Sequence, residues 1–185
     1  MLGRSIAIAA VVSVLVGACQ STVVPSLASM IPSPSSAASA SAQASTPPSP
    51  VAGGCGSTQA FAGPGPDAAL GLADNPWAPA TPADAGIVAY FWYPPPDLLF
   101  AHGPNDRTKV LWISHGGQAG RFAIAAHPLN ASSPVVRFDF GAALSPSGNY
   151  PSSIDLPSPG CWRLELTLGR VHATMDVMVA PSRSS

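Results

Sequence analysis

Charged side chains are scarce in this chain. Asp, Glu, Lys and Arg make up only 9% of its 185 residues, whereas about 25% is usual for soluble domains. Eight basic residues are balanced by nine acidic ones, which gives a formal net charge of -1. Proteins that bind nucleic acid need basic patches to neutralise phosphates. This composition therefore argues against a nucleic-acid partner.

Long stretches free of helix-breaking residues are also lacking. The chain has 22 prolines and 17 glycines, and proline in a helix interior both removes a hydrogen bond and clashes with the preceding turn. This excludes a helical bundle and an α/β sheet with many crossover helices. Hydrophobic residues still make up 46% of the chain, which is enough to build a core.

Charge is absent altogether between Ser5 and Pro66. Before this stretch, Arg4 is followed by an apolar run over 6–16 and then by the small residues that precede Cys19. A positive charge, a short apolar run and small residues together are typical of an export signal. The run is shorter than the roughly 20 apolar residues that a membrane-spanning helix needs.

The segment Val16-Gly17-Ala18-Cys19 resembles the lipobox of bacterial lipoproteins, although leucine is commoner than valine at its first position. The resemblance implies that residues 1–18 are removed and that Cys19 is acylated. Two or more acyl chains give stable membrane attachment. The protein would then lie on the extracytoplasmic face of a bacterial cell membrane. The alternative is an ordinary secretory signal in which Cys19 is incidental.

Residues 19–50 are expected to form a disordered stalk. Ser, Thr, Ala and Pro account for 24 of the 30 residues from 21 to 50, with no charged or aromatic residue among them. Such a composition cannot bury enough apolar surface to offset the entropy of ordering. We expect a folded domain over 51–181 and a disordered tail over 182–185.

The folded region predicts β-structure. Strands are expected at 86–93, 108–114, 121–127 and 135–140, where apolar and β-branched residues are bounded by Pro and Gly. Apolar and polar residues alternate over 161–168 and again over 171–179, around a turn at Gly169. Period-two alternation on both arms predicts a β-hairpin with one buried face.

The segment Pro159-Gly160-Cys161-Trp162-Arg163-Leu164 and the hairpin after it resemble the closing strands of immunoglobulin-like modules on bacterial surface proteins. They are similar in particular to small lipoproteins whose domain ends in a PGCW strand. The expected fold class is therefore all-β, an immunoglobulin-like antiparallel β-sandwich preceded by the disordered stalk. The resemblance implies no catalytic residues.

With Cys19 assigned to lipid, Cys55 and Cys161 remain as an even pair in an exported, oxidising setting. We expect a disulfide between them, and the alternative is two free buried thiols.

Four aromatic residues form the candidate binding surface: Trp77, Tyr90, Trp92 and Tyr93. Both faces of the 86–93 strand are apolar, so either the strand is central and covered on both sides or one face binds a partner. We favour central burial. Proline-rich loops beside Trp77 and Tyr93 offer the second option, a rigid aromatic platform for a glycan or peptide.

Three kinds of chemistry have weaker support. Ser114 or Ser145 could act as a nucleophile, and the segment from Ser114 to Gly117 resembles the His-Gly-Gly segment of some esterases, but the chain lacks a Gly-x-Ser-x-Gly elbow. A copper site could draw on thioether and imidazole ligands. Its candidates are His102, His115, His127, His172, Met175 and Met178.

Paired carboxylates for glycoside cleavage would need two acids that converge. Asp139 and Asp155 are candidates, whereas Glu165 and Asp176 are expected to face outward on the hairpin beside Arg163 or Arg170.

The leading hypothesis is a lipid-anchored envelope protein that displays a non-catalytic interaction or structural domain. We expect no cofactor, no metal and a monomer, with the membrane as one partner and an envelope protein or glycan as another. An exported copper-binding module is the alternative, and a hydrolase is a weaker one.

Overall fold

The computed structural model describes residues 46–101, 108–116, 120–141 and 148–182. The expected signal peptide, Cys19 and most of the expected stalk lie outside these ranges. Within them, no helix is long and apolar enough to cross a membrane.

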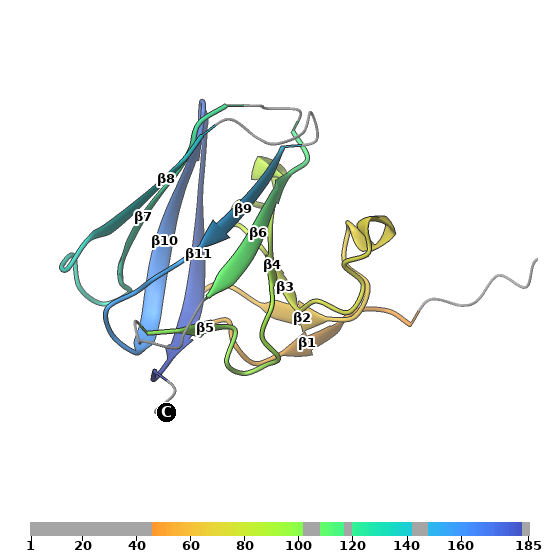
Figure 1. Cartoon of the computed structure of the whole chain (residues 1–185), viewed down its shortest axis with the longest axis horizontal. Coiled ribbons are helices and arrows are strands. Elements are labelled where there is room, and N and C mark those ends of the chain that lie inside the picture. The colour runs from red at the N-terminus through yellow and green to blue at the C-terminus, as the bar shows by residue number, and fades with distance from the viewer. Residues whose placement is uncertain (1–45, 102–107, 117–119, 142–147, 183–185) are drawn as a thin grey trace, which may run out of the picture. The chain divides into compact units, whose positions relative to one another are not determined.

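The described strands form two sheets, and Figure 1 shows how they are arranged. The first sheet has six antiparallel strands in the order β1-β2-β3-β4-β6-β9. Their bounds are Ser49–Val51 (β1), Ala60–Ala62 (β2), Trp77–Pro79 (β3), Ile87–Phe91 (β4), Lys109–Ser114 (β6) and Asn149–Ser153 (β9). The sheet thus takes in the last two residues of the segment assigned to the stalk.

The second sheet has five strands in the order β5-β11-β10-β7-β8. Their bounds are Leu99–Phe100 (β5), Val171–Ala180 (β11), Gly160–Leu168 (β10), Phe122–Pro128 (β7) and Val136–Phe140 (β8). The short edge strand β5 runs parallel to β11, and the other neighbours are antiparallel. Two short 3-10 helices, Ala68–Leu70 and Ala83–Ala85, lie in the connections.

The order in which the chain visits the two sheets is that of an immunoglobulin-like sandwich. The strands β4 and β6 lie in the first sheet, β7 and β8 in the second, β9 in the first, and β10 and β11 in the second. The pairing of β7, β10 and β11 corresponds to the C, F and G strands of that fold. The predicted all-β, immunoglobulin-like antiparallel sandwich is confirmed, with the parallel β5 as an addition.

The closing hairpin has the predicted register. Arm β10 pairs with β11 from Gly160 opposite Val179 to Leu168 opposite Val171. Gly169 has a positive φ of 59°, which glycine adopts without steric cost. The alternate positions predicted to face the core on β10 are buried: Trp162, Leu164, Leu166 and Leu168.

The main core lies between the two sheets. Trp112 of β6 and Trp162 of β10 are both buried. Aromatic rings join the layers at one end, because Phe122 of β7 lies 5.5 Å from Trp112 and 5.1 Å from Tyr150 between ring centroids.

A second, smaller core covers the outer face of the first sheet. It contains Val88 and Tyr90 of β4, Ile113 of β6, Trp77 of β3, and Leu72 from the loop before β3. Every residue of β4 is buried, because one set of alternate side chains faces the main core and the other faces this second cluster. The prediction of central burial is confirmed for Ile87–Phe91. The strand ends before Trp92 and Tyr93, which were expected to belong to it, and Trp92 is 47% exposed.

Candidate functional site

A disulfide joins the start of the described chain to the closing hairpin. Cys55 and Cys161 are bonded, with their Cα atoms 6.0 Å apart and 106 residues between them. The expected pairing is therefore present. Closing a loop of this length stabilises the fold by about 4.7 kcal/mol in the chain-entropy model.

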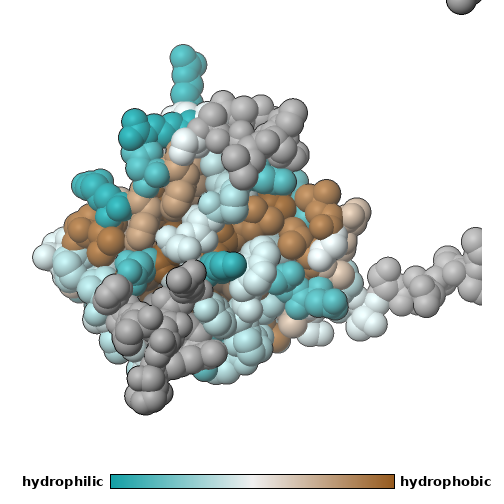
Figure 2. Space-filling view, in the orientation of Figure 1, coloured by the Kyte–Doolittle hydropathy of each residue, from teal (hydrophilic) through white to brown (hydrophobic). Residues whose placement is uncertain are grey.

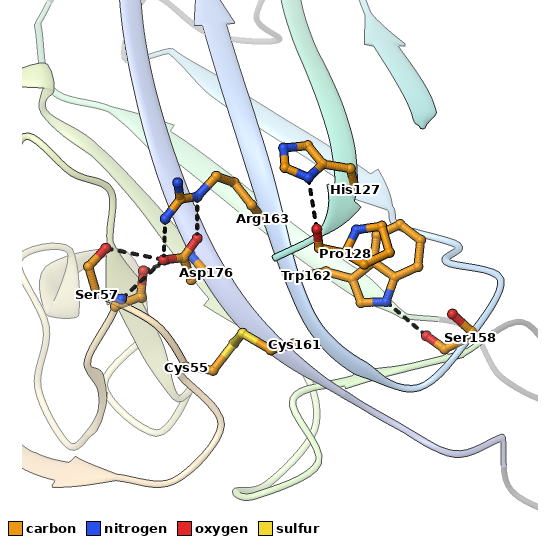
Figure 3. The surroundings of a disulfide bond; sticks show 10 residues. Cys55, Ser57, His127, Pro128, Ser158, Cys161, Trp162, Arg163 and Asp176 are labelled. Carbon is orange, nitrogen blue, oxygen red and sulfur yellow. Dashed lines mark hydrogen bonds and ion pairs between the residues drawn. A yellow bond between two sulfur atoms is a disulfide. The ribbon is translucent and has the colours of Figure 1, made fainter. Parts of the chain in front are cut away.

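A buried ion pair lies beside the disulfide (Figure 3). Arg163 donates two hydrogen bonds to the Asp176 carboxylate, at 2.8 and 3.0 Å. The Ser57 amide and hydroxyl donate two more, at 3.0 and 3.2 Å. Burial opposes ionisation of Asp176, but the Arg163 guanidinium and the Ser57 donors outweigh it, and its pKa lies below the ordinary value.

The expectation that Asp176 simply faces outward is corrected by its burial. Its side chain lies on the outer face of β11, as the alternation predicted, and it contacts Arg163. The loop through Cys55 and Ser57 covers it completely, so its exposure is 0%. By contrast, Glu165 is exposed, with 58% of its side chain accessible.

The four residues of the candidate aromatic surface do not lie together at the surface. Trp77 and Tyr90 are buried in the second core, which fits the favoured central burial and corrects the second option, in which they would contact a ligand. Trp77 stacks on Phe61, with ring centroids 4.7 Å apart. Tyr93 is half-buried, whereas Trp92 is 47% exposed.

Asp67 fixes the loop that covers Tyr90. The Tyr90 hydroxyl donates to Asp67 Oδ2 at 2.9 Å, and the Asp67 amide donates to the same hydroxyl oxygen at 2.9 Å. His115 Nε2 lies 3.2 Å from Asp67 Oδ2. Burial is the largest cause that raises the pKa of Tyr90 above its ordinary value, so the phenol stays protonated and acts as a donor. This cluster holds the covering loop on the sheet.

An open groove of about 570 Å³ lies beside Trp92. Lys109 of β6 pairs with Ser153 of β9, and Trp92 follows Phe91, which pairs with Val110. The ends of β4, β6 and β9 therefore bring an indole, an ammonium and a hydroxyl to one surface. Leu111 and Pro151 add apolar lining. Sequence reasoning identified Trp92 but missed Lys109 and Ser153, because cross-strand register alone brings these two together with it.

Ser114, one of the two candidate nucleophiles, has no base beside it among the described residues. Ser114 is buried at the end of β6, and no hydrogen bond joins it to a histidine within the described ranges. Its neighbour His115 contacts Asp67 instead. Ser145 and Gly117 lie outside the described residues.

The candidate copper ligands that the structure describes are dispersed. His127 contacts Glu165 at 3.7 Å, and His172 lies 3.3 Å from the Thr167 hydroxyl. Met175 is buried in the main core, whereas Met178 is 40% exposed. The described residues contain no group of three or more His, Cys, Asp or Glu side chains that could hold a metal ion. His102 lies outside them.

The two candidate acids for glycoside cleavage, Asp139 and Asp155, belong to different sheets or their connections. Asp139 lies in β8, where Arg121 binds its carboxylate through two hydrogen bonds. This ion pair is exposed and lowers the pKa of Asp139, chiefly through the Arg121 hydrogen bonds. Asp155 lies just after β9, which belongs to the first sheet.

Comparison with known proteins gives one distant structural similarity. No protein-family model and no curated protein matches the chain. A crystal structure from Bacillus anthracis, of a protein described as a candidate lipoprotein, covers 57% of this chain and 78% of its own. The two share 14% sequence identity, with a TM-score of 0.38.

Proposed function

We propose that this protein is a lipid-anchored cell-envelope protein whose β-sandwich binds a partner without catalysis. The disulfide between Cys55 and Cys161 is the observation that supports export, because stable disulfides belong to oxidising compartments. The N-terminal signal and Cys19 supply the anchor.

The groove beside Trp92 is the proposed contact surface. An exposed indole stacks on the apolar face of a sugar ring at little entropic cost, since the side chain has only two rotatable bonds. Lys109 has no ion-pair partner among the described residues, so its ammonium is available for an anionic group. The groove therefore suits an acidic glycan of the envelope.

Isothermal titration calorimetry of the full-length protein in detergent tests this binding. The probes are a hexuronate oligosaccharide and a neutral glucose oligomer of equal length. We expect saturable heat of binding with the acidic probe, lost in Trp92→Ala and weakened in Lys109→Ala. Leu70→Ala is the matched control, because Leu70 is 58% exposed and does not line the groove. Equal responses from all variants would contradict the proposal.

Detergent phase separation tests the anchor. We expect the full-length protein in the detergent phase and the Cys19→Ser variant in the aqueous phase. Wild-type protein that partitions into the aqueous phase would contradict it.

A further inference from the structure

We propose that strand β8 is a homodimerisation edge at which two copies of this chain pair antiparallel about Phe138, in place of the monomer expected from the sequence. Strand β8 ends the second sheet, and Figure 1 shows no described element on its outer side. An edge strand directs the N–H and C=O groups of alternate residues away from its neighbour, where a further strand can bind them.

The other described edges are protected, whereas β8 is not. At the first sheet, β1 contains Pro50 and β9 contains Pro151, and proline lacks the N–H that a new ladder needs. At the second sheet, β5 has only two residues. The β8 sequence Val-Arg-Phe-Asp-Phe contains neither proline nor glycine.

The two faces of β8 differ in a way that fixes how a second strand can pair. Val136, Phe138 and Phe140 are half-buried and pack against the main core. Arg137 and Asp139 are exposed on the outer face. A shift of one residue would place core-facing side chains opposite outward-facing ones, so only registers that keep this alternation extend the sheet.

Charge selects one register among these. When Phe138 pairs with its own copy, Arg137 lies opposite Asp139 of the other copy, and the symmetry gives this contact twice. A shift by two residues places either Arg137 or Asp139 opposite itself, and like charges directly opposite are destabilising. The sequence of β8 is therefore complementary to itself in charge.

Arg137 and Asp139 have small neighbours on β7. The residues opposite them there are Ala125 and Ala123. These border an open groove of about 310 Å³ that lies over β7 and β10, on the side of β8 away from the second copy. Arg137 has no ion-pair partner among the described residues, whereas Asp139 already binds Arg121. A carboxylate has two oxygens and can accept from a second arginine.

A pair of charge-reversal variants tests the inference on the full-length chain in detergent, with the protein mass measured by light scattering. We expect the wild type to change from monomer to dimer as its concentration rises. Arg137→Asp places only acids at the edge, and Asp139→Arg places only bases there. We expect each variant alone to dimerise at least about tenfold more weakly than wild type, and an equimolar mixture to form a heterodimer.

Cysteine cross-linking checks the register independently. A mixture of Arg137→Cys and Asp139→Cys chains is expected to form a disulfide-linked dimer, which neither variant forms alone. Circular dichroism establishes that each variant is folded. A wild type that is monomeric at all concentrations, reversal variants that dimerise like wild type, or a mixture that stays monomeric would each overturn the inference.

Discussion

Tyr90 and Asp67 are joined by two hydrogen bonds, one in each direction. The phenol donates to the carboxylate and accepts from the amide of the same residue, both at 2.9 Å. This contact fastens the covering loop to β4 and encloses Trp77. The outer face of the first sheet is thereby buried near its middle, and its exposed part lies toward Trp92.

Tyr90→Phe is expected to destabilise the fold by about 1–3 kcal/mol, because the buried Asp67 amide and carboxylate each lose a partner. Urea unfolding at neutral pH measures the change. An unfolding midpoint equal to wild type would show that the contact does not stabilise the loop.

The raised pKa of Tyr90 predicts alkaline sensitivity. The phenol of the unfolded chain ionises near its ordinary value of about 10, whereas the folded protein keeps its proton. Stability is full below that pH and falls as pH rises above it. This loss is expected to be smaller in Tyr90→Phe. Equal pH dependence of the two proteins would contradict the assignment.

Asp176→Asn is expected to destabilise the fold by about 3 kcal/mol, because it breaks the ion pair with Arg163 at a buried position. This is the lower end of the range for buried pairs, since the Arg163 side chain is partly exposed to solvent. Arg121→Gln is the matched control, since it breaks an exposed aspartate–arginine pair and is expected to change stability little. Thermal unfolding compares them. Equal effects would contradict the role of burial at Asp176.

Asp176 also predicts acid sensitivity. Its folded pKa lies below the ordinary value of about 3.9, so its contribution to stability is full above that pH. The contribution is lost as pH falls through the folded pKa, because the unfolded chain takes up the proton first. Acid unfolding of Asp176→Asn is therefore expected to be less steep than that of the wild type.

Replacing both Cys55 and Cys161 by Ser is expected to lower the free energy of unfolding by up to about 4.7 kcal/mol. The single variant Cys19→Ser is the control, because Cys19 is not part of the disulfide. Denaturant unfolding without reductant measures both. A double variant as stable as wild type would show that the long loop closure contributes nothing.

Trp92 is expected to account for most of the acrylamide quenching of tryptophan fluorescence, because Trp77, Trp112 and Trp162 are all buried. Trp92→Phe should therefore remove the readily quenched component. Quenching that persists unchanged would show that another tryptophan reaches the surface.

The sequence could predict the sandwich because its longer strands alternate apolar and polar residues. The hairpin of β10 and β11 is the clearest case, since both arms keep period two. The short strands β1, β3 and β9 each contain a proline. Their sequences therefore do not predict strands, because proline is unusual there. They form strands because they pair with neighbouring strands of the sheet.

The burial of Asp176, and the segment that covers Tyr90, could not be predicted from local sequence. Asp176 alternates with apolar neighbours like any outward-facing residue, but a loop more than a hundred residues earlier covers it. The apolar pattern of its strand favoured burial of Tyr90, but it could not show that the Asp67 loop is the segment that encloses it. Both outcomes depend on contacts between distant segments, which period and composition do not encode.

Mass spectrometry of Cys19 in the full-length protein, isolated from membranes, shows whether the protein is lipid-anchored. We expect an N-terminus at Cys19, with a diacylglyceryl group on its sulfur. A mature protein that carries unmodified Cys19, or that begins at another residue, would contradict it.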